Sequence, residues 1–230
     1  MPPPPRHGNH VPYRLAGTTF DASGRPAALV ARLGRAYVHG MAQSDGQRHL
    51  AGMLLVAMPG MEDPRFARSV IYLCAHTAEG AMGLVVNQAA SQVTFPAVIG
   101  QLGIEADSGC ADTPVHVGGP VQPSRGFVLH SSDYVQDSTL VIDDHYALTA
   151  TVDVLRAIAT GGGPERRVLA LGYAGWDAGQ LDAEIQGNGW LVAPADPEIV
   201  FGRDNGTKWL RAMRAIGVDP LLLSSTAGHA

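Results

Sequence analysis

The distribution of hydrophobic residues divides the chain near residue 50. Residues 1–50 combine a run of prolines with scattered arginine, glycine and serine, and they carry no sustained periodicity beyond a short apolar stretch at Ala27–Leu33. Such a segment buries too little apolar surface to offset the entropy that is lost on ordering. We therefore predict a flexible extension over residues 1–45, with Met41 as a reasonable alternative start, and one folded domain over residues 46–230.

From residue 52 onward, apolar runs of strand length are separated by short turn-forming segments. Met53–Met58 is continuously apolar, which is typical of a strand buried on both faces. Ser69–Cys74 and Ala81–Val86 read as two further strands, and the glycine-bearing connection between them predicts an antiparallel hairpin. The remaining expected strands cover residues 115–117, 126–130, 139–142, 168–173 and 189–192.

Helical segments are interspersed irregularly with these strands. Thr94 is placed to open a short helix through Leu102, and Gly103 to terminate it. Asp177, with Gln180 three positions on, forms a capping-box-like start for another helix. Two more helices are expected over residues 151–159 and 207–216. Because strands and helices do not alternate regularly, we predict a single α+β domain with a mixed, mainly antiparallel sheet and flanking helices.

Charge is distributed unevenly along the chain. Residues 1–50 hold six arginines against two aspartates, a net charge of +4, whereas residues 51–230 hold ten basic against 19 acidic residues, a net charge of −9. An acidic body repels nucleic-acid phosphates, whose neutralisation supplies most of the affinity for DNA or RNA. Direct nucleic-acid binding is therefore not expected, and a regulatory role is expected to run through a protein partner.

Composition gives no sign of a membrane span or an export signal. The longest apolar runs, such as Met53–Met58, are under half the roughly 20 residues that a transmembrane helix needs. The N-terminal segment Met1–Arg6 lacks the basic and apolar regions of a secretory signal. These observations predict a cytoplasmic protein in which Cys74 and Cys110 are free thiols, without a disulfide framework, structural metal or cofactor.

Cys74 and His76 are the first candidates for chemistry, as a nucleophile–base pair or as two metal ligands. In an extended strand, residues two apart share a face but lie about 6.5 Å apart, too far for a direct thiol–imidazole hydrogen bond unless the strand ends there. A metal ion would need further ligands, for which His116 and His130 are available. The preferred interpretation is a buried cysteine and a loop histidine.

A glycine pair and an arginine form a second candidate site. Gly118 and Gly119 could cradle an anion with their backbone N–H groups, with Arg125 pairing a phosphate or carboxylate. The alternative is a tight turn that needs a positive φ angle. His130 and Asn87 each close a strand where a loop begins, so they suit either ligand binding or turn formation. The predicted ligand-binding residues are Gly118, Gly119, Arg125, His130 and Asn87.

The connection at Gly172–Leu181 lies where α/β enzymes often bind ligands. It contains neither a dinucleotide-binding glycine motif, nor a phosphate-binding lysine, nor a nucleophile elbow. Trp176, at a helix entrance, is interpreted as a packing residue. Asp182 and Glu184 lie about 200° apart around a helix, so they cannot serve one site directly and are interpreted as solvated side chains.

Ten short segments carry a resemblance to a known family: Met53–Met61, Asp63–Pro64, Arg68–Cys74, Gly80–Asn87, Gly118–Val121, Arg125–His130, Leu171–Trp176, Gly179–Leu181, Asn188–Leu191 and Gly228–Ala230. Together, over roughly residues 50–230, they resemble the YqgE/AlgH family. The departures include Ala75, where the family usually has an acidic residue, which argues against a catalytic carboxylate there. The resemblance implies an α+β domain whose sheet curls into a barrel-like shape, and a bacterial, cytosolic protein. One branch of the family is labelled with transcriptional regulation of exopolysaccharide production.

These observations favour a non-catalytic regulatory or interaction module that acts through a protein partner or a small ligand. The alternative is a hydrolase or transferase that acts on a small anionic substrate held by Gly118, Gly119 and Arg125. A third hypothesis, direct DNA binding, is opposed by the negative charge of the folded part.

Overall fold

The structure is a computed structural model that describes residues 50–105 and 112–220, so the predicted extension over residues 1–45 lies outside the described part. Within these ranges the chain forms nine strands and five helices. The strands are β1 (Met53–Ala57), β2 (Val70–Thr77), β3 (Gly80–Val85), β4 (Val115–Val117), β5 (Val121–Ser131), β6 (Leu140–Val141), β7 (Tyr146–Thr149), β8 (Arg167–Asp177) and β9 (Trp190–Pro194). The helices are α2 (Phe95–Gln101), α3 (Val152–Ala159), α4 (Gln180–Gln186), α5 (Pro197–Val200) and α6 (Asn205–Ala215).

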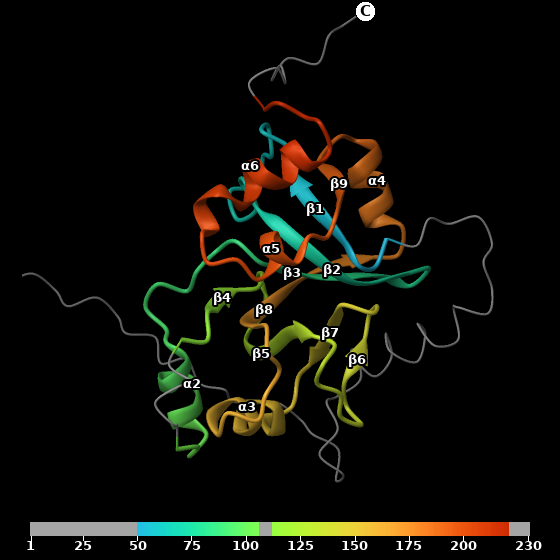
Figure 1. The fold of residues 1–230 in the computed structure, drawn as a ribbon. Coiled ribbons are helices and arrows are strands. Elements are labelled where there is room, and N and C mark those ends of the chain that lie inside the picture. The colour runs from blue at the N-terminus through green and yellow to red at the C-terminus, as the bar shows by residue number, and fades with distance from the viewer. Residues whose placement is uncertain (1–49, 106–111, 221–230) are drawn as a thin grey trace, which may run out of the picture.

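All nine strands belong to one curled sheet, in the order β6-β7-β5-β8-β3-β2-β1-β9, with β4 paired to β8 (Figure 1). The pairings are antiparallel except for β4 with β8. The predicted α+β class, the mainly antiparallel sheet with its barrel-like curl and the β2–β3 hairpin are therefore confirmed. β8 joins the two halves of the sheet, because its first part pairs with β5 and its last part with β3.

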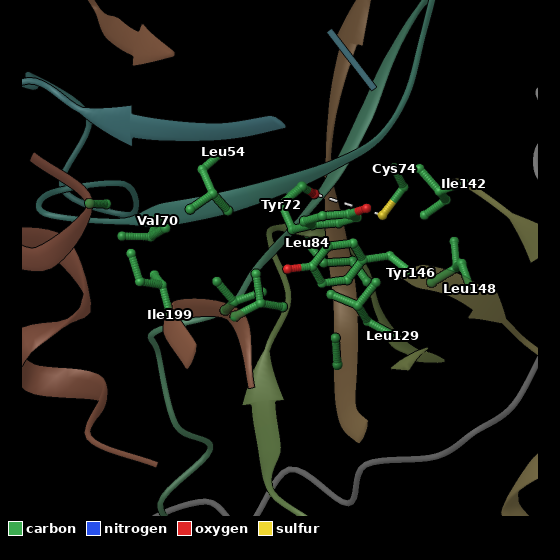
Figure 2. Close-up of a cluster of buried hydrophobic side chains, with 14 of the residues drawn as sticks. Leu54, Val70, Tyr72, Cys74, Leu84, Leu129, Ile142, Tyr146, Leu148 and Ile199 are labelled. Carbon is green, nitrogen blue, oxygen red and sulfur yellow. Dashed lines mark hydrogen bonds between the residues drawn. The ribbon is translucent and has the colours of Figure 1, made fainter. Parts of the chain in front are cut away.

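The apolar residues of the described part divide into three clusters. The largest fills the inside of the curl, where Tyr72 and Tyr146 lie with ring centroids 4.7 Å apart (Figure 2). α5 and α6 contribute Ile199, Val200, Trp209 and Met213 to this cluster. A second cluster packs α2 and α3 against β4, β5 and β8. The third lies between α4 and strands β1, β2, β3, β8 and β9, and it forms the base of the candidate site below.

Helix termini follow the sequence signals in most places. Thr94 caps α2 by accepting a hydrogen bond from the Ala97 N–H across 3.3 Å, and Gly103 follows the helix with a φ of 68°, as predicted. The prediction for α4 was wrong in its start. Asp177 is the last residue of β8, and α4 begins at Gln180 after Gly179, which takes a left-handed conformation. Only the reciprocal half of the capping box forms, from the Asp177 N–H to Gln180 Oε1 across 3.0 Å.

Two elements, β7 and α5, were not predicted, and β5 and β8 are longer than expected. None of the helices in residues 50–105 and 112–220 has the length and apolarity that a membrane crossing requires.

Candidate functional site

The predicted glycine pair lies at the crossing of two backbone segments. A Cβ on Gly118 would stand 2.3 Å from the carbonyl oxygen of Gly172, and one on Gly119 would stand 2.2 Å from the carbonyl carbon of Tyr173. Gly119 also has a φ of 151°, which L-residues with side chains rarely adopt. The Gly118 N–H donates to the Leu171 carbonyl oxygen across 2.8 Å, so it is used within the fold. The close approach of the two backbones therefore accounts for both glycines, and anion binding by this pair stays a prediction.

Arg125 is half-buried on β5, with its guanidinium carbon 5.0 Å from the ring centroid of Phe127. Its Nη1 donates to Gln122 Oε1 across 3.3 Å. Nε and Nη2 are buried, and within the described residues they have no hydrogen-bond partner. Desolvation lowers the pKa of the guanidinium, against a smaller effect of Tyr173 that raises it. Arg125 therefore retains donor capacity that could meet an anion.

His130 and Asn87 both have partners inside the fold. The Nδ1 of His130 lies 2.8 Å from the Ser131 carbonyl oxygen, so it carries the proton, and Nε2 accepts from the Thr149 hydroxyl across 2.9 Å. Burial lowers the pKa of this imidazole below its ordinary value. Asn87 accepts from the Val70 N–H and donates to the Arg68 carbonyl oxygen, which ties the end of β3 to the start of β2. Ligand binding by these two residues stays a prediction.

Cys74 and His76 do not form a pair. The register of β2 against β3 shifts between Leu73 and Ala75, which marks a β-bulge that interrupts the alternation of side chains. Cys74 joins the interior cluster (Figure 2), whereas His76 lies 3.4 Å from Asp182 of α4. The expectation that His76 belongs to a loop was wrong, because it lies within β2 and is buried. No group of three His, Cys, Asp or Glu residues in the described part is arranged to hold a metal ion.

The main cavity of interest lies elsewhere, over the cluster beneath α4. It is a groove of about 670 Å³ where the β1–β2 connection, the turn before β5, the end of β8, α4 and the turn before β9 converge. We call it the aromatic groove. The lining residues used below are Glu62, Asp63, Arg65, Phe66, Trp176, Gln180, Glu184 and Trp190.

The carboxylate of Glu184 organises this groove. Its Oε2 accepts hydrogen bonds from both indole N–H groups, from Trp176 across 2.9 Å and from Trp190 across 2.8 Å. Its Oε1 accepts from Gln180 Nε2 across 2.8 Å. The two indole rings meet edge to face with centroids 6.0 Å apart, and Phe66 meets Trp190 in the same way at 5.7 Å. Both tryptophans are therefore held in fixed orientations by a single acidic side chain.

Sequence reasoning missed this arrangement, although it placed Trp176 at a helix entrance. Trp176 and Trp190 pair across strands with Ala81 and Ala57, whose small side chains leave room for the two rings over the sheet. The interpretation of Glu184 as a solvated helix residue was wrong, because its carboxylate binds both indoles. The geometric argument that Asp182 and Glu184 cannot serve one site is confirmed, since Asp182 lies against His76 instead.

A smaller hollow of about 270 Å³ lies near the start of β8 and the end of α5. Four of its charged residues form ion pairs, Arg166 with Glu198 at 2.6 Å and Arg203 with Asp112 at 3.4 Å. Arg167 donates to Thr113 and to the Pro164 carbonyl oxygen. These internal pairings make it a weaker candidate than the aromatic groove.

Comparison with known proteins gives a consistent result. The AlgH-like family (DUF179) matches residues 54–221. A UPF0301 protein of Rhodospirillum rubrum is 59% identical over 182 residues, covering 79% of this chain and 95% of that relative. The solution structure of the AlgH protein from Pseudomonas aeruginosa matches with a TM-score of 0.66 at 43% identity, covering 82% of this chain and 100% of that one.

A crystal structure of a protein from Corynebacterium diphtheriae matches with a TM-score of 0.60 at 25% identity, covering 76% of this chain and 90% of that one. Sequence and fold similarity thus extend over the whole curled sheet and its helices. The chain belongs to the AlgH-like family, also called UPF0301 or YqgE/AlgH.

Proposed function

We propose that this protein is a non-catalytic regulatory or interaction module of the cytoplasm, which binds a protein partner in the aromatic groove. The observation that carries the proposal is the fixed pair of Trp176 and Trp190, both bonded to Glu184 in a groove where several connections converge. The two indoles are nearly buried, with 8% and 3% of their surface exposed, so they give the groove a rigid wall that a partner can meet without reorganisation. A groove lined by such rings and a few placed polar groups is a suitable recognition site.

Charge supports a protein partner over a nucleic acid. The three carboxylates of the groove lining, Glu62, Asp63 and Glu184, exceed its one basic residue, Arg65. This matches the acidic balance of residues 51–230 and would repel phosphate groups. A small ligand that fills the same groove is the other form of this hypothesis.

The proposal is tested by closing the groove at its rim. Pro120 is exposed and lines the groove, so Pro120→Trp places a large ring at its mouth. Pro123 is exposed three residues later on β5 but does not line the groove, so Pro123→Trp is the matched control. We expect proteins captured from native bacterial lysate by the wild type and the control to be depleted with Pro120→Trp, as measured by quantitative mass spectrometry. Equal capture by all three proteins, with no groove-dependent thermal shift across a metabolite panel, would refute the proposal.

A second candidate is an enzyme, a hydrolase or transferase, that acts on a small anionic substrate near Gly118, Gly119 and Arg125. The buried Nε and Nη2 of Arg125, which have no hydrogen-bond partner among residues 50–105 and 112–220, favour it. If it is correct, inorganic phosphate raises the melting temperature of the wild type, and Arg125→Ala abolishes that increase while the unliganded protein melts nearly as before. A large loss of stability without ligand would instead make Arg125 structural.

A further inference from the structure

Within the described residues, the half-exposed carboxylate of Glu184 accepts hydrogen bonds only from neutral donors. Its carboxylate accepts from Trp176, Trp190 and Gln180, all of which are uncharged. Among residues 50–105 and 112–220 no cation forms an ion pair with it. A carboxylate has about four acceptor sites, so one of them remains for a further donor.

The other charged residues of the groove lining leave the negative charge of Glu184 uncompensated. Asp63 is neutralised by Arg65, whose Nη2 lies 2.6 Å from Asp63 Oδ2. Arg65 also lies with its guanidinium carbon 5.8 Å from the ring centroid of Phe66, at the edge of the groove. Three carboxylates against one guanidinium leave the lining with a net charge of −2. The groove thus combines uncompensated negative charge with aromatic walls.

We propose that the aromatic groove binds an arginine side chain of the partner protein, an inference that rests on the proposed function. A guanidinium stacks its flat face on an aromatic ring while its edge donates hydrogen bonds in the plane. The groove offers both contacts, with the partly exposed ring of Phe66 as the stacking surface and the accessible edges of the nearly buried Trp176 and Trp190 beside the remaining acceptor site of Glu184. A lysine ammonium is a compact point charge without a flat face, so it uses this combination less fully.

The probe is a pair of short peptides that differ only in charge. Acetyl-Gly-Arg-Gly-amide carries the guanidinium, and the citrulline counterpart replaces it with a neutral urea group of nearly the same shape. Binding is followed by the ¹⁵N–¹H signals of the three tryptophan indoles in the full-length protein. Trp209 is the internal reference, because its indole donates to the Ala57 carbonyl oxygen from the opposite cluster.

We expect the arginine peptide to shift the indole signals of Trp176 and Trp190 in a saturable way, and to leave that of Trp209 in place. The citrulline peptide should bind at least ~10-fold more weakly, because it lacks the charge that the rings and Glu184 attract. Equal shifts with both peptides, no shift at millimolar concentration, or stronger binding of the matching lysine peptide would each overturn the inference.

Two variants separate the charge of Glu184 from the overall acidity of the protein. Glu184→Gln retains an oxygen that accepts from the indoles but removes the charge, and it should weaken the arginine peptide by ~10-fold or more. Glu79→Gln removes the same charge from the exposed β2–β3 turn and should leave the affinity unchanged. Equal losses in both variants would reduce the effect to long-range attraction and overturn the inference.

The outcomes also separate this inference from the proposed function. If Pro120→Trp depletes a partner but the arginine peptide does not bind, the groove is an interface for another chemistry, and the arginine inference alone fails. If the peptide binds but no partner depends on the groove, the proposed function fails instead.

Discussion

Lys208 donates a hydrogen bond from its Nζ to the carbonyl oxygen of Val86 across 2.7 Å, although the two residues lie 122 positions apart. A second bond runs from the same Nζ to the carbonyl oxygen of Val200 across 3.0 Å. Lys208 is the only lysine of the chain, and its side chain is fully buried. One ammonium group therefore joins α6 to the ends of β3 and α5.

Replacing this ammonium should destabilise the fold at neutral pH. Lys208→Met keeps most of the side-chain volume but leaves the carbonyl oxygens of Val86 and Val200 without their buried donor. We expect the free energy of unfolding to fall by about 1–3 kcal/mol, the usual cost of unsatisfied buried polar groups, reduced by the desolvation cost that the charge no longer imposes. Urea unfolding measures this change, and a variant more stable than the wild type would contradict it.

The difference in the free energy of unfolding between the wild type and Lys208→Met should depend on pH. Desolvation, and then repulsion from Arg211, lower the pKa of Lys208 from 10.5 to about 8, against a smaller attraction from Asp204. Because the folded-state pKa lies below the ordinary value, the charged amine costs folding free energy below about pH 8. That cost is relieved as the pH rises from about 8 to about 10.5. The stability advantage of the wild type over Lys208→Met should therefore grow across this window, and an advantage that shrinks would contradict the assignment.

Cys74 should resist alkylation in the native protein. Its side chain is fully buried in the interior cluster, and burial raises the pKa of its thiol above the ordinary value. Reaction requires the thiolate and access to it, so both conditions are unfavourable. We expect the peptide that contains Cys74 to remain unlabelled by iodoacetamide until the protein is unfolded in guanidinium chloride, as followed by mass spectrometry. Rapid native labelling would indicate that the interior opens easily.

Much of the fold follows from sequence patterns, because the strands of the described part are marked by apolar runs and the helix ends by glycine or threonine. The prediction failed where a local pattern competes with tertiary structure. β8 was expected to end at Tyr173, whereas it continues to Asp177 through its pairing with β3. Gly172 lies inside the strand because a Cβ there would stand 2.4 Å from the Gly119 carbonyl oxygen. α5 has only four residues, too few to carry helical periodicity.

The candidate site was harder to predict, because its members are distant in the sequence. Phe66, Trp176, Glu184 and Trp190 meet only through the pairing of β1 with β9 and of β3 with β8. An acidic residue on a short helix has the same local pattern whether it faces water or two indoles. Conversely, Asn87 and His130 are conspicuous at strand ends, yet both have hydrogen-bond partners within the fold.

The crossing of Gly119 over Gly172 makes a sharp stability prediction. Gly119→Ala would place a Cβ 2.2 Å from the Tyr173 backbone and would also strain the positive φ angle. We expect a loss of about 3 kcal/mol or more, at the upper end of overpacking effects. Gly100→Ala is the control, because a Cβ there meets nothing within 4 Å and Gly100 lies within α2. It should stabilise the protein by about 0.5–1 kcal/mol. Similar urea midpoints for the two variants would exclude a tight crossing.

The shared acceptor in the aromatic groove predicts unequal effects of two substitutions at one position. Glu184→Ala leaves the nearly buried indole N–H groups of Trp176 and Trp190 without an acceptor, so it should cost about 2 kcal/mol or more. Glu184→Gln retains an oxygen for both indoles and should cost less than about 1 kcal/mol. Urea unfolding gives both values, and faster hydrogen exchange at the indoles of Trp176 and Trp190 should accompany the alanine variant alone. If the two variants unfold alike, Glu184 does not hold the two rings. The groove is then not preorganised by this carboxylate, and recognition there cannot depend on it.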